Sequence, residues 1–207
     1  LARKLNRRNG QKRNGLKKNV TEVESSRLDV LLSLMMSDFM TRLTILILIL
    51  MVVLPSQDEV DPATTLTSVG QIVPDFTITT TDGTVYTSQN LRGHVYVLDF
   101  FATWCAPCLE AMPHLQSKVW EAYGDGELLL LGIGREHSSN ELAYFVKDKG
   151  YTFPVAADPE RKMYGKFASM FIPRTYLIGR EGTILYQSVG YDEEEFDRLL
   201  AAVKGAF

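Results

Sequence analysis

The stretch that decides the fold is Val95-Tyr96-Val97-Leu98-Asp99-Phe100-Phe101, followed closely by Trp104-Cys105-Ala106-Pro107-Cys108. The first part is an apolar run interrupted only by Asp99, which is typical of a strand buried on both faces. The second part opens a predicted helix that continues to about Tyr123, where Gly124-Asp125-Gly126 ends it. The chain has no other cysteines. A Cys-x-x-Cys pair at a strand-to-helix junction is a candidate redox-active dithiol, because the helix N-terminus stabilises a thiolate.

Turn signals and hydrophobic runs divide the chain after residue 70 into short strands and helices. Asp82-Gly83 predicts a hairpin between 76–79 and 84–87, because this dipeptide suits a two-residue turn. Further strands are predicted at 128–133, 151–156, 175–178 and 183–189. Further helices are predicted at 138–149, 158–167 and 192–203, with Ser138, Asp158 and Asp192 as their N-caps. This order predicts an α/β domain with a central mixed sheet flanked by helices and an N-terminal β-hairpin.

The chain before residue 70 has a different composition. Residues 1–19 hold eight Lys or Arg and no acidic residue, although the net charge of the whole chain is -3. Such an arm could bind nucleic acid or anionic lipid. It precedes the apolar run 43–54, which favours a role in membrane topology instead, so no nucleic-acid partner is expected. The predicted organisation is a basic arm at 1–39, a signal peptide or membrane anchor at 40–55, a polar linker at 56–69 and a folded domain at 70–207.

The apolar run 43–54 is shorter than the roughly 20 residues that span a bilayer, and it fits the core of a signal peptide, about 7–15 residues. Arg42 gives it a positive flank, so the positive-inside rule places the basic arm in the cytoplasm and the rest of the chain outside. The segment is either cleaved or kept as an anchor that contacts the membrane through 43–54. The basic arm is either a real cytoplasmic segment or sequence upstream of a true start at Met40, Met35 or Met36.

Residues 70–207 resemble the thioredoxin superfamily, and within it the extracytoplasmic TlpA/ResA-like thiol–disulfide oxidoreductases. Four features of the sequence carry the resemblance. They are the Trp-Cys-x-x-Cys motif after the apolar strand, Pro113 five residues past the second cysteine, Ile172-Pro173-Arg174-Thr175 before a strand, and a strand and helix at 128–151. The resemblance implies a thioredoxin-like fold in which that strand and helix are inserted between the two halves.

The resemblance also implies a role for each residue around the dithiol. Cys105, with its sulfur partly exposed, is expected to attack a substrate disulfide, and the more buried Cys108 to resolve the mixed disulfide. Asp99 stands where classical thioredoxins carry a buried acid that handles the proton of the second cysteine, and burial would raise its pKa. Pro173 is expected to be cis. The residues expected to contact the substrate are Trp104, Ala106, Pro107, Ile172 and Pro173.

Two charged residues near the motifs are less informative. Many relatives carry a glutamate three residues after the second cysteine, but Ala111 stands there and Glu110 precedes it. One position turns a side chain by about 100° around a helix, so Glu110 is predicted to be a surface charge. Arg174 is expected either to favour acidic partners or to be solvated.

No cofactor is expected beyond the redox-active Cys105–Cys108 disulfide. A zinc site needs about four ligands, and the chain has no second cysteine pair. Its histidines are scattered, and His114 is predicted to be a solvated helix residue. No metal site is therefore predicted. The histidines in question are His94, His114 and His137.

The resemblance implies an enzyme that reduces disulfides in exported proteins, with a role like that in cytochrome c maturation and with electrons from a membrane thiol reductant. The implied location is the bacterial cell envelope, in the periplasm or on the outer face of the cytoplasmic membrane. The Ala106-Pro107 dipeptide differs from the Pro-His pair of oxidising relatives, which favours a reductase. Two alternatives are a non-catalytic binding module and a thiol peroxidase. Peroxiredoxins need Thr or Ser where this chain has Ala102.

Overall fold

The computed structural model describes residues 62–124 and 126–207. Residues Val60–Phe207 form one compact unit. The predicted basic arm, the apolar run 43–54 and the first residues of the predicted linker lie outside the described residues. Within 62–124 and 126–207, none of the helices has the length and apolar character that a membrane crossing requires.

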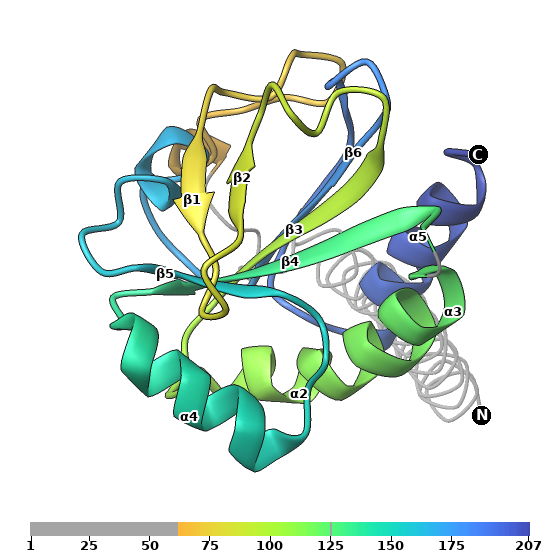
Figure 1. The fold of residues 1–207 in the computed structure, drawn as a ribbon. Helices are drawn as coiled ribbons and strands as arrows, with labels where there is room; N and C mark the ends of the chain where they lie inside the picture. The colour runs from red at the N-terminus through yellow and green to blue at the C-terminus, as the bar shows by residue number, and fades with distance from the viewer. Residues whose placement is uncertain (1–61, 125) are drawn as a thin grey trace, which may run out of the picture. The chain divides into compact units, whose positions relative to one another are not determined.

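A five-stranded mixed sheet forms the centre of the fold, with the strand order β5-β4-β3-β6-β7 (Figure 1). β3 pairs in parallel with β4 and antiparallel with β6, as the predicted mixed sheet requires. All the residues of β3 are buried, which explains its apolar run. The strands are β3 Val95–Phe101, β4 Leu128–Arg135, β5 Val155–Asp158, β6 Arg174–Ile178 and β7 Ile184–Val189.

The predicted N-terminal hairpin is confirmed as β1 (Thr77–Thr79) and β2 (Val85–Thr87), which pair antiparallel. At its turn, the Asp82 carboxylate accepts a hydrogen bond from the backbone N–H of Thr84 at 3.0 Å. An antiparallel bridge between Thr80 and Ala156 then joins the hairpin to β5.

The long helix predicted after the dithiol is present in three consecutive segments. They are α2 (Ala106–His114), a π-helical segment (Leu115–Trp120) and α3 (Glu121–Tyr123). Pro113 lies inside α2 and has no backbone N–H to donate, and the wider π-helical turns begin two residues later. The first half of the helix therefore holds the dithiol, and the second half packs on the sheet.

Two further helices begin at the predicted N-caps. α4 (Ser139–Lys149) begins with a full capping box, in which Ser138 accepts from the Glu141 N–H and the Glu141 carboxylate accepts from the Ser138 N–H. α5 (Glu193–Lys204) begins at Asp192, whose carboxylate accepts from the Glu195 N–H at 2.7 Å.

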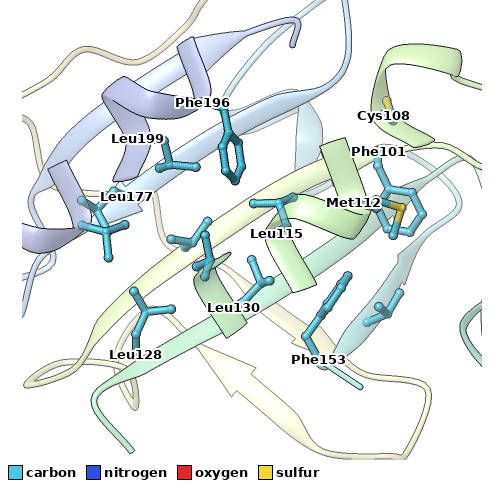
Figure 2. Packing of buried hydrophobic residues seen from close by; sticks show 14 of the residues in the cluster. Phe101, Cys108, Met112, Leu115, Leu128, Leu130, Phe153, Leu177, Phe196 and Leu199 are labelled. Atoms are coloured by element: carbon cyan, nitrogen blue, oxygen red, sulfur yellow. The ribbon is translucent and has the colours of Figure 1, made fainter. Parts of the chain in front are cut away.

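The sheet separates two apolar layers. Side chains alternate along β3, so Val95, Val97 and Phe101 face α2, α4 and α5, where they pack with Met112 and Phe196. Figure 2 shows this layer, with the side chains of α2 and α5 lying against those of the strands. The opposite face of the sheet is covered by the hairpin and by the segment 163–168. The dithiol belongs to the first layer, because Cys105 and Cys108 are members of that cluster.

The helix predicted at 158–167 is wrong. Asp158 is instead the last residue of β5, and only a 3-10 turn, η3 (Tyr164–Lys166), follows. The Asp158 carboxylate still caps, but it accepts from the N–H groups of Met163 at 3.1 Å and Tyr164 at 2.7 Å. The sequence contained the correct capping residue, and the turn that it caps begins five residues further along the chain.

The predicted linker is also wrong from Pro62 onward. A short 3-10 turn, η1 (Pro62–Thr64), opens this segment, and Thr64 and Thr67 are buried. The backbone N–H of Leu66 donates to the Phe167 carbonyl at 2.9 Å. The hydroxyl groups of Thr64 and Thr67 form hydrogen bonds within the domain, so the polar composition of this segment does not mean that it is solvated.

Candidate active site

The dithiol lies where the chain leaves β3 and enters α2. Cys105 is the N-cap of α2, and its Sγ accepts a hydrogen bond from the backbone N–H of Cys108 at 3.3 Å. The two cysteines form a disulfide with an S–S distance of 2.05 Å. When the disulfide is reduced, the helix N-terminus and this N–H group are placed to stabilise a thiolate on Cys105.

The two sulfur-bearing residues differ in exposure. Cys108 is completely buried, whereas Cys105 keeps 5% of its surface exposed. The predicted order is confirmed, but Cys105 is less exposed than predicted because the Ile172 carbonyl oxygen lies 3.7 Å from its Sγ. Trp104, Ala106 and Pro107, which are predicted to contact the substrate, are exposed around it.

The loop before β6 lies against the dithiol. Its Ile172–Pro173 peptide bond is cis, which confirms the prediction for Pro173. The carbonyl oxygen of Ile172 lies 3.7 Å from the sulfur of Cys105. The backbone of this loop therefore borders the sulfur of Cys105.

Asp99 is confirmed as a buried acid on the dithiol side of the sheet. It follows Val95 and Val97 in the alternation of β3, so it faces the layer that contains Cys108. Burial raises the pKa of Asp99 to about 7, and a hydrogen bond from Thr175 Oγ1 at 2.9 Å opposes this rise. Glu110 is exposed, as predicted for a surface charge.

Arg174 overturns both expectations for it, because it neither reaches solvent nor faces a partner. Its side chain is completely buried. The guanidinium donates to the Met170 carbonyl at 2.9 Å, to Thr65 Oγ1 at 2.7 Å and to Thr64 Oγ1 at 2.9 Å. Arg174 therefore joins the start of β6 to the segment 62–67 through hydrogen bonds, which explains why that segment is part of the domain.

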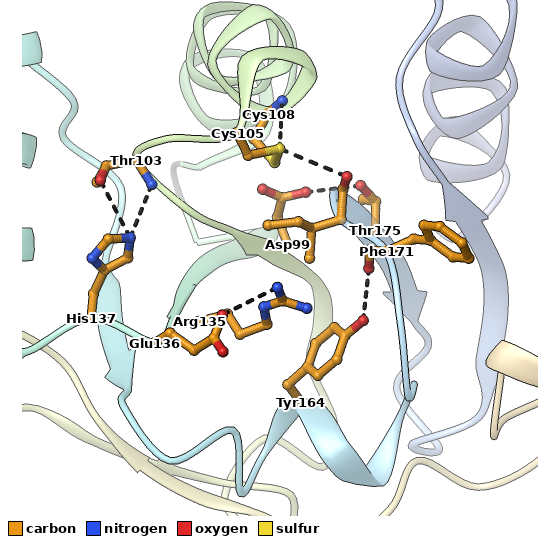
Figure 3. The surroundings of a disulfide bond; sticks show 11 residues. Asp99, Thr103, Cys105, Cys108, Arg135, Glu136, His137, Tyr164, Phe171 and Thr175 are labelled. Carbon is orange, nitrogen blue, oxygen red and sulfur yellow. Dashed lines mark hydrogen bonds and ion pairs between the residues drawn. A yellow bond between two sulfur atoms is a disulfide. The ribbon is translucent and has the colours of Figure 1, made fainter.

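His137, which the sequence analysis gives only as one of three scattered histidines, lies beside the site. It is buried, and its Nε2 accepts a hydrogen bond from the backbone N–H of Thr103 at 3.0 Å. Figure 3 shows the imidazole beside the chain that leads from β3 to the dithiol. Its position two residues after β4 is a usable signal, because the C-terminal ends of parallel neighbours such as β3 and β4 meet at one edge of the sheet.

His114 is also not the solvated residue that was predicted. Its ring stacks on Tyr191 with centroids 5.9 Å apart and lies 5.7 Å from the ring of Phe196. In the described ranges 62–124 and 126–207, no group of three or more His, Cys, Asp or Glu side chains is placed to hold a metal ion.

Two comparisons of the sequence with known proteins match the same part of the chain. A sequence model described as the AhpC/TSA family matches residues 69–187. Thiol-disulfide oxidoreductase ResA of Bacillus thuringiensis (strain Al Hakam) is 27% identical over 127 residues, which cover 61% of this chain and 73% of that protein.

Solved structures give the same picture. The solution structure of a candidate protein disulfide isomerase from Bacteroides thetaiotaomicron has a TM-score of 0.66 and 36% identity, covering 69% of this chain and 92% of that chain. A candidate thiol:disulfide interchange protein DsbE from Chlorobium tepidum has a TM-score of 0.59 and 26% identity, covering 67% of this chain and 97% of that chain.

Proposed function

This chain belongs to the AhpC/TSA family and is a thiol–disulfide oxidoreductase, and from that premise we propose that it acts as a reductase of disulfides in exported proteins. The observation that carries the proposal is the placement of Cys105. It caps a helix N-terminus, keeps the only exposed surface of the pair and lies beside a backbone carbonyl that a client strand would approach.

In the proposed reaction, the Cys105 thiolate attacks one sulfur of a client disulfide. A bond forms between Cys105 Sγ and the client, and the other client sulfur leaves as a thiolate. Cys108 then attacks Cys105 Sγ, which closes the protein disulfide and releases the second client thiolate. Two electrons pass from the dithiol to the client, so the client disulfide is reduced and Cys105–Cys108 is oxidised.

Asp99 is proposed as the acceptor of the Cys108 proton. Cys108 is completely buried and needs a base within the same layer before it can attack. Asp99 faces that layer, and a pKa of about 7 lets it both accept and return a proton near neutral pH. No cofactor beyond the dithiol enters this scheme.

The clients are disulfide-containing proteins, and Ile172 and Pro173 would pair with an extended client segment by strand addition. We further propose that a membrane thiol reductant returns the electrons and that the domain works in the bacterial cell envelope. The apolar run 43–54 behind a positive flank supports this location. A role like that in cytochrome c maturation would follow if the clients are haem-site cysteines.

Insulin reduction by dithiothreitol tests the proposal. The wild-type protein should accelerate the precipitation of insulin chains, and Cys105→Ser and Cys108→Ser should not. The variant Glu110→Gln, which removes an exposed charge on α2, the helix that begins at the dithiol, should keep the wild-type rate. A non-catalytic binding module would give no acceleration, and a thiol peroxidase would consume peroxide instead.

A further inference from the structure

Phe171 has a backbone conformation that its residue type does not favour. In the described ranges 62–124 and 126–207, Glu136, Arg161 and Phe171 are the non-glycine residues with positive φ, and Phe171 has φ 68°. This left-handed region suits glycine, because the Cβ of other residues crowds the backbone there. The Phe171 side chain is 47% exposed, so burial in the core does not compensate for the strain.

The surrounding residues hold Phe171 in this conformation. Its carbonyl accepts a hydrogen bond from the hydroxyl of Tyr164 at 2.7 Å. Tyr164 is completely buried, and the guanidinium carbons of Arg135 and Arg161 lie 4.9 Å and 5.3 Å from the centre of its ring. Arg161 also donates to the Ser169 carbonyl at 2.9 Å. A strained backbone conformation that several surrounding contacts hold in place is typical of functional sites.

The strained residue stands next to the reacting sulfur. Phe171 directly precedes Ile172, whose carbonyl contacts Cys105 Sγ at 3.7 Å. On the other side, Trp104 directly precedes Cys105, is 62% exposed and lies over the guanidinium of Arg135. In Figure 3 the Phe171 ring points away from Tyr164 and out of the loop. An exposed aromatic residue therefore flanks each end of the Cys105–Ile172 contact.

We propose that Phe171 is a specificity-determining residue, which contacts an apolar side chain next to the client cysteine that Cys105 attacks. The inference deepens the proposed function and rests on it. Glycine would make the same turn without strain, so the backbone conformation alone gives no reason for a phenyl ring at this position. Phe171 adjoins Ile172, along which the proposed client segment would lie. The client is a polypeptide with an aromatic or aliphatic residue beside its disulfide.

Two matched peptide disulfides test this proposal. Each is a short homodimer joined by one disulfide, with either phenylalanine or serine next to the cysteine. The protein turns over each peptide with dithiothreitol as the reductant that restores its dithiol, and kcat/KM above the uncatalysed rate is measured for the wild type, Phe171→Gly, Phe171→Ala and Phe171→Trp. Tyr144→Ala is the matched control, because Tyr144 is an exposed aromatic residue on α4, 74% exposed. Stoichiometric reduction of the small polar reagent bis(2-hydroxyethyl) disulfide by the reduced protein reports the dithiol chemistry without an apolar group beside the disulfide.

The wild type and Tyr144→Ala should prefer the phenylalanine peptide by about tenfold, because roughly half of the Phe171 ring remains to be buried. Phe171→Gly and Phe171→Ala should lose this preference through a higher KM, and Phe171→Trp should restore it. All variants should reduce the small reagent at the wild-type rate. A wild type without preference, or a preference that survives in Phe171→Gly, overturns the proposal. Failure of the wild type to reduce the small reagent would instead overturn the proposed function.

Discussion

The burial of Asp99 predicts an unusual dependence of stability on pH in the oxidised protein. In this form neither cysteine titrates, so Asp99 can be observed without them. Its pKa moves from 3.8 to about 7 on folding, because burial disfavours the carboxylate more than the Thr175 hydrogen bond favours it. The folded protein therefore holds a proton that the unfolded chain releases, and stability falls as the pH rises between these two values.

The magnitude follows from the size of the shift. Each pKa unit corresponds to about 1.4 kcal/mol, so ionisation of Asp99 removes about 4 kcal/mol of stability across this window. Asp99→Asn cannot ionise and lacks this loss. The difference in unfolding free energy between the variant and the wild type should therefore grow by about 4 kcal/mol from roughly pH 4 to roughly pH 8. The cost of the amide itself cancels in this comparison.

Urea unfolding of both oxidised proteins at several pH values measures this difference. With an m value of about 2 kcal/mol/M, the midpoint of Asp99→Asn should move by about 2 M relative to the wild type across the window. Glu110→Gln, an exposed control, should follow the wild type. Parallel profiles for the wild type and Asp99→Asn would refute the reasoning, since they would mean that Asp99 titrates normally. In the reduced protein, Asp99→Asn should also resolve the mixed disulfide between Cys105 and a client about 100-fold more slowly, because it lacks the carboxylate that accepts the Cys108 proton.

Three further predictions concern the parts that support the site. Arg174→Met should lower the unfolding free energy by about 3 kcal/mol in urea titrations, because it removes a buried guanidinium and leaves its acceptors without that donor; Arg174→Lys should recover part of the loss. Gly134→Ala should cost about 1–3 kcal/mol in the same assay, because the added Cβ would lie 2.4 Å from Leu142 Cδ1. His137→Leu should lower the unfolding free energy by about 1–2 kcal/mol, because the Thr103 N–H loses its acceptor. It should also change the rate at which Cys105 is alkylated in the reduced protein. An unchanged rate would show that this hydrogen bond does not position the dithiol.

The parts of the fold that could be predicted are those fixed by local physical chemistry. The buried run of β3, the capping box of Ser138 and Glu141, and the turn at Asp82-Gly83 depend on residues a few positions apart. The dithiol at the start of α2 depends on the same short range. Each of these features can therefore be predicted from the sequence alone.

The features that could not be predicted depend on distant partners. The hydrogen bond from Arg174 to Thr65 joins residues 109 positions apart, so neither the buried charge nor the ordered segment gives a local signal. The sequence predicts that Asp158 caps a helix, but the turn that it caps, η3, depends on the packing of Tyr164 against the sheet. Thr175 becomes a partner of Asp99 only because β3 and β6 pair in this register.

The central claim is that Cys105 attacks the client and Cys108 resolves the intermediate, and trapping tests it most directly. Reduced Cys108→Ser and Cys105→Ser are each mixed with oxidised insulin, and the adducts are digested and identified by mass spectrometry. Cys108→Ser should accumulate a one-to-one mixed disulfide at Cys105, while Cys105→Ser should form almost none, because Cys108 is completely buried. Equal trapping by both variants, or an adduct on Cys108 alone, would contradict the assignment.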